Sequence, residues 1–215
     1  MEQASNDGID TVLSKETWTA EDASELLQNA SSMDGGPERL KALLREMESE
    51  EDEPRGALAL KIGIARYVLC RFAEALEALS AATDNKDRHY VQAQCLKYLG
   101  SYDRAAEEFQ RAGDRGWDPD EIQLQLVEVQ ALSGDRDEAR KTLQGLEGKL
   151  DGSAEFLYRK GLIDELDGFG ERAAETYEQA RADNPNHAGA TFRLAYYLDL
   201  RGDEDRAIEL YKECT

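Results

Sequence analysis

Four glycines recur at a spacing of 34 residues along the second half of the chain, and three other ladders of residues share that period. Self-similarity at a fixed period of this length is typical of repeat architectures, so it constrains the fold more than composition does. The glycines are Gly100, Gly134, Gly168 and Gly202. The other ladders are Ala105, Ala139, Ala173 and Ala207; Phe109, Leu143, Tyr177 and Tyr211; and Ala112, Leu146, Ala180 and Cys214.

The spacing within each unit predicts a pair of helices. Ala173, Tyr177 and Ala180 are four and three residues apart, which places them on one stripe of a helix. Gly168, just before this stripe, is expected to end the preceding helix, because glycine enters the left-handed conformation without a side-chain penalty. A single helical pair cannot bury its apolar stripe alone, so the units must stack.

At these positions the sequence resembles the tetratricopeptide repeat family, whose unit has glycine, alanine, aromatic, alanine and a late proline in this order. Pro119 and Pro185 stand where the late prolines are expected. The resemblance covers residues 56–215 and implies an all-α fold. That fold is a right-handed α–α superhelix, a solenoid of about five hairpins behind an N-terminal helical cap. The expected units are 56–85, 86–119, 120–153, 154–187 and 188–215.

The first half of the chain departs from this pattern. Ala75 and Ala105 are 30 residues apart, so the first unit is four residues short. Cys70 stands where its turn glycine would be, and His89 and Gln123 replace the large residue early in the first helix of the next two units. Less regular packing is therefore expected in this half.

The N-terminal quarter is strongly acidic, with 15 acidic and 5 basic side chains in residues 1–55. We expect a flexible N-terminus over 1–18, then a helical cap hairpin and an acidic linker over 19–55. Thr19 and Asp22 predict a capping box at the start of the first helix of this hairpin. Trp18, just before it, is expected to pack on the hairpin.

The acidic run 48–53 ahead of Pro54 is interpreted as a solvated linker, and an acidic interaction tail is the alternative. The whole chain has a net charge of -20. That charge argues against direct binding to nucleic acid or to anionic membranes, which need basic surfaces. Three widely spaced cysteines do not predict a disulfide framework, so a cytoplasmic location is expected.

No motif in the sequence predicts catalysis. His89 and His187 are 98 residues apart, no two cysteines have C-x-x-C spacing, and no phosphate-binding glycine loop occurs. We therefore predict a non-enzymatic protein with no catalytic residue, no cofactor and no metal site.

The resemblance implies that the first helices of the hairpins line a concave groove in which the family binds peptides. Aromatic residues are frequent at the transferred positions, and packing of these rings between hairpins is the alternative. Arg159 and Arg193 could hold an acidic group, or Arg159 could pair with Glu155. The predicted groove residues are Tyr67, Tyr90, Gln94, Lys97, Tyr98, Tyr158, Arg159, Phe192, Arg193 and Tyr196.

The predicted function is a scaffold that binds a protein or peptide partner with basic residues. One alternative rests on residues 116–121, 184–190 and 194–211, which resemble planctomycete-type bacterial proteins. In those, such repeats precede a domain similar to the C-terminal domain of the RNA polymerase alpha subunit. The chain would then be the docking or regulatory arm of a longer transcription-associated protein.

The other alternative is end-to-end self-assembly. It would use the apolar face of the last hairpin, which we expect to be uncapped and to include Leu194, Leu198, Ile208 and Tyr211.

Overall fold

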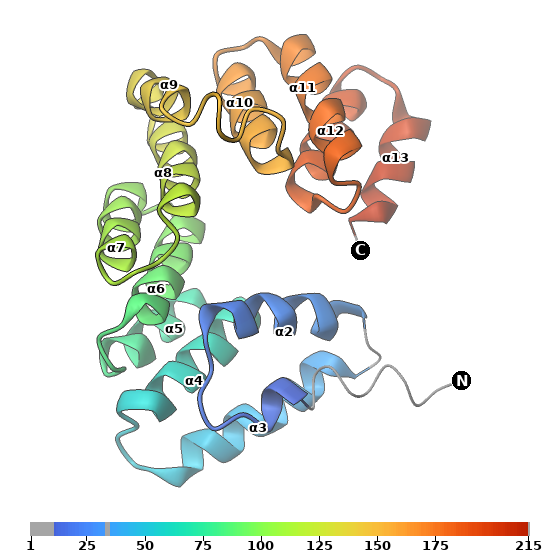
Figure 1. The fold of residues 1–215 in the computed structure, drawn as a ribbon. Coiled ribbons are helices and arrows are strands. Elements are labelled where there is room, and N and C mark those ends of the chain that lie inside the picture. The colour runs from blue at the N-terminus through green and yellow to red at the C-terminus, as the bar shows by residue number, and fades with distance from the viewer. Residues whose placement is uncertain (1–10, 33–34, 215) are drawn as a thin grey trace. The chain divides into compact units, whose positions relative to one another are not determined.

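A computed structural model describes residues 11–32 and 35–214, and this part of the chain is made of helical hairpins without a strand (Figure 1). The all-α fold class is confirmed. The chain forms two compact units, residues 1–117 and 118–215. Unit 1 contains α2 (Ala20–Ser32), α3 (Gly36–Glu50), α4 (Gly56–Val68), α5 (Phe72–Ser80), α6 (Lys86–Tyr98) and α7 (Tyr102–Asp114). Unit 2 contains α8 (Pro119–Ser133), α9 (Arg136–Gln144), α10 (Ala154–Leu166), α11 (Gly170–Asp183), α12 (Ala188–Leu200) and α13 (Glu204–Glu213).

The glycine ladder forms the turns between paired helices, as predicted. The four glycines have φ angles between 72° and 97°, in the left-handed region. At Gly100 this conformation lets its N–H donate to Lys97 O at 3.0 Å, while Ser101 N–H donates to Leu96 O at 2.9 Å. These bonds satisfy carbonyls at the end of α6 and start the return helix α7.

The alanine ladder lies where two paired helices touch. Ala105 and Ala139 are 0% exposed, and Ala173 and Ala207 are 1% exposed. Their small side chains let the helix axes approach, and the ring of Tyr177 fills the space beside Ala173 in the core of unit 2. The first helices of these hairpins are α4, α6, α8, α10 and α12.

Two glycines inside first helices were missed by the sequence analysis. A Cβ added to Gly161 would lie 2.6 Å from Tyr177 Cε1, and one added to Gly63 would lie 2.5 Å from Leu79 Cγ. The two glycines are 98 positions apart, which is the same place in the first and fourth units. Both therefore permit a close approach of the second helix to the first.

The N-terminal segment differs from the flexible tail that we expected. Residues 1–10 of that tail lie outside the described part of the chain, but in residues 11–18 Val12 is 0% and Trp18 1% exposed. Lys61 of α4 fixes this segment, since its Nζ donates to Lys15 O at 2.8 Å and lies 5.2 Å from the Trp18 ring centroid. The segment is therefore packed on unit 1.

The predicted capping box at the start of α2 is confirmed. Thr19 N–H donates to Asp22 Oδ2 at 2.7 Å, and Asp22 N–H donates to Thr19 Oγ1 at 3.2 Å. Asp87 of α6 accepts a further bond from Ala20 N–H at 3.0 Å, so α2 packs on α6 as well as on α3 and α4. The acidic run 48–53 begins inside α3, because that helix extends to Glu50. The boundary between the N-terminal cap and the first repeat stays a prediction.

Gly161→Ala tests the close approach of α10 and α11. Overpacking of this kind costs about 1–3 kcal/mol, and the better helix propensity of alanine offsets up to about 1 kcal/mol of it. We expect the free energy of unfolding in urea to fall by about 1–2 kcal/mol. The matched control is Gly152→Ala, because a Cβ there meets nothing within 4 Å. Equal stabilities of the two variants would contradict the packing argument.

Cys70→Gly tests the turn that lacks its glycine. Cys70 has a φ of 57° and is exposed, and no other non-glycine residue in the described part has a positive φ. A left-handed side chain costs about 1–2 kcal/mol, so we expect the variant to gain about 1 kcal/mol of stability. The reverse change, Gly100→Cys, should lose a similar amount. A less stable Cys70→Gly protein would show that the thiol contributes more than the strain costs.

Candidate functional site

Aromatic side chains gather in unit 1 where α4 and α6 end and α5 begins. The ring of Tyr98 stacks on Phe72 with centroids 4.8 Å apart, and Tyr67 lies 6.3 Å from Tyr98. Burial, and then the neighbouring Tyr98, raises the pKa of Tyr67. Tyr98 itself is 60% and Leu99 47% exposed, and Lys97 Nζ lies 5.8 Å from the Tyr98 ring centroid. We call these five residues the Tyr98 patch.

Two other predicted groove residues in unit 1 face its interior. Tyr90 stacks on Trp117 with centroids 3.9 Å apart and meets Phe109 edge-on at 5.6 Å. Gln94 is 8% exposed. The ring of Tyr90 thus packs between helices, which was the alternative to a place in the groove. Gln94 is too buried to offer a partner much contact area.

Arg159 is held inside unit 2 by acidic neighbours. It is 5% exposed, pairs with Glu128 at 3.1 Å and also with Glu155, and donates through Nε to Leu124 O at 3.4 Å. Its guanidinium carbon lies 4.8 Å from the ring centroid of Tyr158. Burial, and then the charge of Glu128, raises the pKa of Tyr158 to about 12. The ion pair with Glu155 is therefore present, and little of this positive charge is left for a ligand.

Arg193 is engaged in a similar way. Its Nη1 lies 2.8 Å from Glu165 Oε1, and Tyr177 Oη donates to Glu165 Oε2 at 2.7 Å. Burial, and then the charge of Glu165, raises the pKa of Tyr177. Glu165 of α10 thus holds a tyrosine of its own hairpin and an arginine of the next hairpin together.

The last hairpin, α12–α13, leaves several apolar side chains exposed. Phe192 is 52%, Tyr196 46% and Ile208 50% exposed, and Tyr211 lies 5.8 Å from Phe192 between ring centroids. We call these four residues the end face. Leu194, which we expected there, is 1% exposed and packs in the core of unit 2, and Leu198 is partly buried against the same core.

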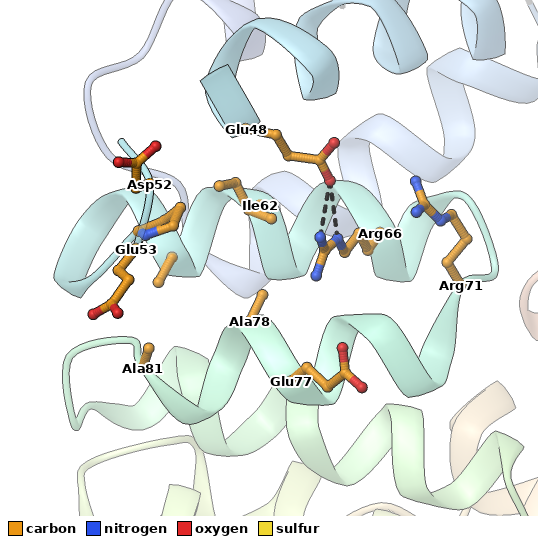
Figure 2. A pocket seen from close by; sticks show the side chains of 11 residues that line it. Glu48, Asp52, Glu53, Ile62, Arg66, Arg71, Glu77, Ala78 and Ala81 are labelled. Atoms are coloured by element: carbon orange, nitrogen blue, oxygen red, sulfur yellow. Dashed lines mark hydrogen bonds and ion pairs between the residues drawn. The ribbon is translucent and has the colours of Figure 1, made fainter. Parts of the chain in front are cut away.

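A cavity of about 450 Å³ lies in unit 1 between the end of α3, the segment that follows it, and α4 and α5. Figure 2 shows the Glu48 carboxylate pointing toward the guanidinium of Arg66, with Nη2 2.9 Å from Oε1. Ala59 and Ile62 line the cavity beside this pair. Asp52, Glu53, Arg71 and Glu77 also line it, so charged side chains of both signs surround the cavity.

His89 forms a polar cluster that the sequence analysis did not find. The ring is 4% exposed, with Nδ1 2.5 Å from Glu108 Oε2 and Nε2 2.5 Å from Asp84 Oδ1. The hydrogen bond from Arg115, and then the one with His89, lowers the pKa of Asp84 to about 2. Both ring nitrogens are engaged, so the cluster connects α6 and α7 rather than offering a free base. The sequence feature that could have revealed this cluster is the histidine at position 89, where the repeat pattern has a large residue.

Within residues 11–32 and 35–214, no group of three or more His, Cys, Asp or Glu side chains could hold a metal ion. No helix in this described part is long and apolar enough to cross a membrane.

Residues 167–214 match the family model described as a tetratricopeptide repeat. The last part of the chain therefore resembles a tetratricopeptide repeat. The crystal structure of the APC/C hetero-tetramer Cut9–Hcn1 is similar over 98% of this chain, with 14% sequence identity and a TM-score of 0.67. At this identity the likeness shows the fold alone. The chain described here spans 41% of the length of that similar chain.

Two smaller structures of comparable length are also similar. MamA residues 41 to the end from Desulfovibrio magneticus RS-1 is 19% identical, with 73% of this chain and 91% of that chain covered and a TM-score of 0.49. YrrB, described as a tetratricopeptide-repeat protein with an unusual peptide-binding site, is 16% identical, with 80% and 90% covered and a TM-score of 0.46. No curated protein matches the chain.

The pH dependence of stability tests the charge network of unit 2. Burial would raise the pKa of Glu155, but its contacts with His187 and Arg159 outweigh burial and lower the pKa to about 2. Its stabilisation is therefore fully present above its ordinary pKa of 4.5 and is lost as the pH falls toward 2. We expect the stability difference between wild type and Glu155→Gln to shrink between about pH 5 and pH 2 in urea titrations.

The control for this titration is Glu175→Gln, since Glu175 is an exposed residue of α11. The same chemical change there should leave the stability difference small at every pH. A Glu155→Gln difference that stays constant with pH would contradict the role of the ionised carboxylate.

Proposed function

We propose that this protein is a non-enzymatic scaffold that binds a partner polypeptide through exposed aromatic side chains of its first helices. One observation carries the proposal. Tyr98, Phe192 and Tyr196 are 60%, 52% and 46% exposed, although Leu96 and Leu194 of the same two helices are 3% and 1% exposed. Tyrosine and phenylalanine offer large contact areas at a low cost in conformational entropy, and aromatic residues are enriched in interfaces.

The proposed surface is narrower than the groove predicted from the sequence. Tyr158 and Arg159 are 9% and 5% exposed, so they act by supporting neighbours rather than by contacting a partner over a large area. The surfaces that remain are the Tyr98 patch in unit 1 and the end face in unit 2. Each is proposed separately as a binding surface.

The charge of the chain suggests the chemistry of the partner. A net charge of -20 favours a partner with basic residues and disfavours nucleic acid. We place this interaction in the cytoplasm, as the cysteine pattern predicts. The transcription-associated arm stays a prediction from resemblance, and self-assembly is opposed by the repulsion between two such acidic chains.

Affinity capture followed by measurement with the purified partner tests the proposal. Truncating an interface hot spot costs about 2 kcal/mol or more, so we expect Tyr98→Ala, or the pair Phe192→Ala and Tyr196→Ala, to weaken binding more than tenfold. The control is Phe169→Ala, because Phe169 is 53% exposed but lies at the start of a second helix. Variants should be compared at equal thermal stability.

An identical set of captured proteins, bound with identical affinity by all of these variants, would show that the exposed aromatic residues do not form the binding surface. Equal loss in the Phe169→Ala protein would show that exposure alone, rather than position on a first helix, decides binding.

A further inference from the structure

The α12–α13 hairpin packs on the α10–α11 hairpin. The outer side of α12–α13 has the same residue pattern as the surface of α10–α11 on which it packs. Residues that lie 34 positions apart occupy equivalent places in the α10–α11 and α12–α13 hairpins. Aromatic, apolar and acidic positions are all conserved in kind between the two hairpins. The equivalent pairs are Tyr158 and Phe192, Leu162 and Tyr196, Glu165 and Asp199, Ala174 and Ile208, and Tyr177 and Tyr211.

The two surfaces differ in what covers them. Leu162 is 0% and Ala174 8% exposed, and α12 packs on α11, the helix that carries Ala174. Their equivalents Tyr196 and Ile208 are 46% and 50% exposed, since no helix in the described part of the chain covers the end face. The end face is thus a surface on which one more helix could pack.

The seated hairpin shows how such a helix is fixed. Arg193 projects from α12 to Glu165, with 2.8 Å between Nη1 and Oε1, and Tyr177 Oη orients the other carboxylate oxygen at 2.7 Å. The side chains of Arg193 and Glu165 are only 28% and 26% exposed, so the pair is partly shielded from water. Charge-assisted bonds of this type are stronger than neutral ones.

A carboxylate and a tyrosine occupy the same two repeat positions on the end face. Asp199 stands where Glu165 stands in the preceding hairpin, and it has no hydrogen-bond or ion-pair partner among the described residues. Asp199 and Tyr211 occupy the repeat positions of Glu165 and Tyr177, 34 residues further along the chain. Burial, and then the negative charge of Asp199, raises the pKa of Tyr211.

We propose that the end face, together with Asp199, is a docking site for a helix of another protein whose arginine pairs with Asp199 beside Tyr211. The helix seated on the preceding hairpin indicates the rest of its chemistry. Around Arg193, α12 presents Ala190, Leu194 and Ala195, which are 0%, 1% and 0% exposed. The partner helix accordingly carries small and apolar residues three before its arginine and one and two after it.

A second copy of this chain is not the occupant that the charges favour. Each copy carries a net charge of -20. Two such chains would repel each other, whereas a basic helix would be attracted. The inference rests on the proposed function of partner binding, and it specifies which residues the helix of one such partner carries.

A peptide copied from the chain itself provides the probe. It has the sequence of residues 188–200 with Phe192→Gln and Tyr196→Gln, so that it keeps Arg193 and the inward face of α12 but not the outer rings. Labelled with fluorescein, it is titrated with the full chain and followed by anisotropy. We expect saturable binding that Asp199→Asn in the chain weakens by about tenfold.

Replacing the arginine of the peptide by glutamine should weaken binding to wild type by a similar factor. It should cause no further loss with the Asp199→Asn chain, because the two groups then act as one pair. The matched control is Glu209→Gln, an exposed carboxylate of α13, which should change the affinity by less than twofold. This control separates the specific pair from general attraction between the peptide's arginine and the acidic chain.

Equal affinity of the peptide for wild type and Asp199→Asn would overturn the inference, and so would the absence of binding to wild type. Sedimentation of the chain alone gives a further outcome: a mass that doubles with concentration, and more readily after Asp199→Asn, would assign the end face to a second copy. None of these results depends on the capture experiment, so failure here leaves the broader scaffold function open to its own test.

Discussion

The contact between the two helices of each hairpin is the interaction on which the rest of the structure depends. Ala105 and Ala173 are almost completely buried at these contacts, and Gly161 removes the last side chain that would keep Tyr177 away from α10. Since protein interiors are packed as densely as organic crystals, one additional methyl group at such a position must displace its neighbours. The turn glycines then only have to reverse the chain where the first helix ends.

Close packing of successive hairpins also decides which polar groups remain available. Where one hairpin seats on another, their charges are used internally: Glu165 holds Arg193, and Glu128 and Glu155 hold Arg159. Desolvated charges must be paired, so the buried arginines cannot serve as ligand-binding groups at the same time. We therefore propose that a partner binds where exposed apolar side chains remain, at the Tyr98 patch and at the end face.

The candidate surfaces show which exposed residues could be predicted from the repeat pattern and which could not. Position in the repeat correctly identified Tyr98, Phe192 and Tyr196 as side chains on first helices, but the same rule included Tyr90, which stacks on Trp117, and Arg159, which is 5% exposed. Equivalent repeat positions differ in exposure because the neighbour on the next hairpin differs. A period of 34 residues contains no information about that neighbour's size or charge.

The sequence by itself determined the helical pairs, the turns and the alanine contacts, because these depend on residues a few positions apart within one unit. Only the tertiary structure decided the rest: that Val12 is buried and Lys61 lies over Trp18, that His89 lies between Asp84 and Glu108, and that Leu194 is buried while Tyr196 is not. Each of these outcomes depends on contacts between different elements of the fold. Local periodicity defines one face of a helix, but only the packed chain shows what lies against it.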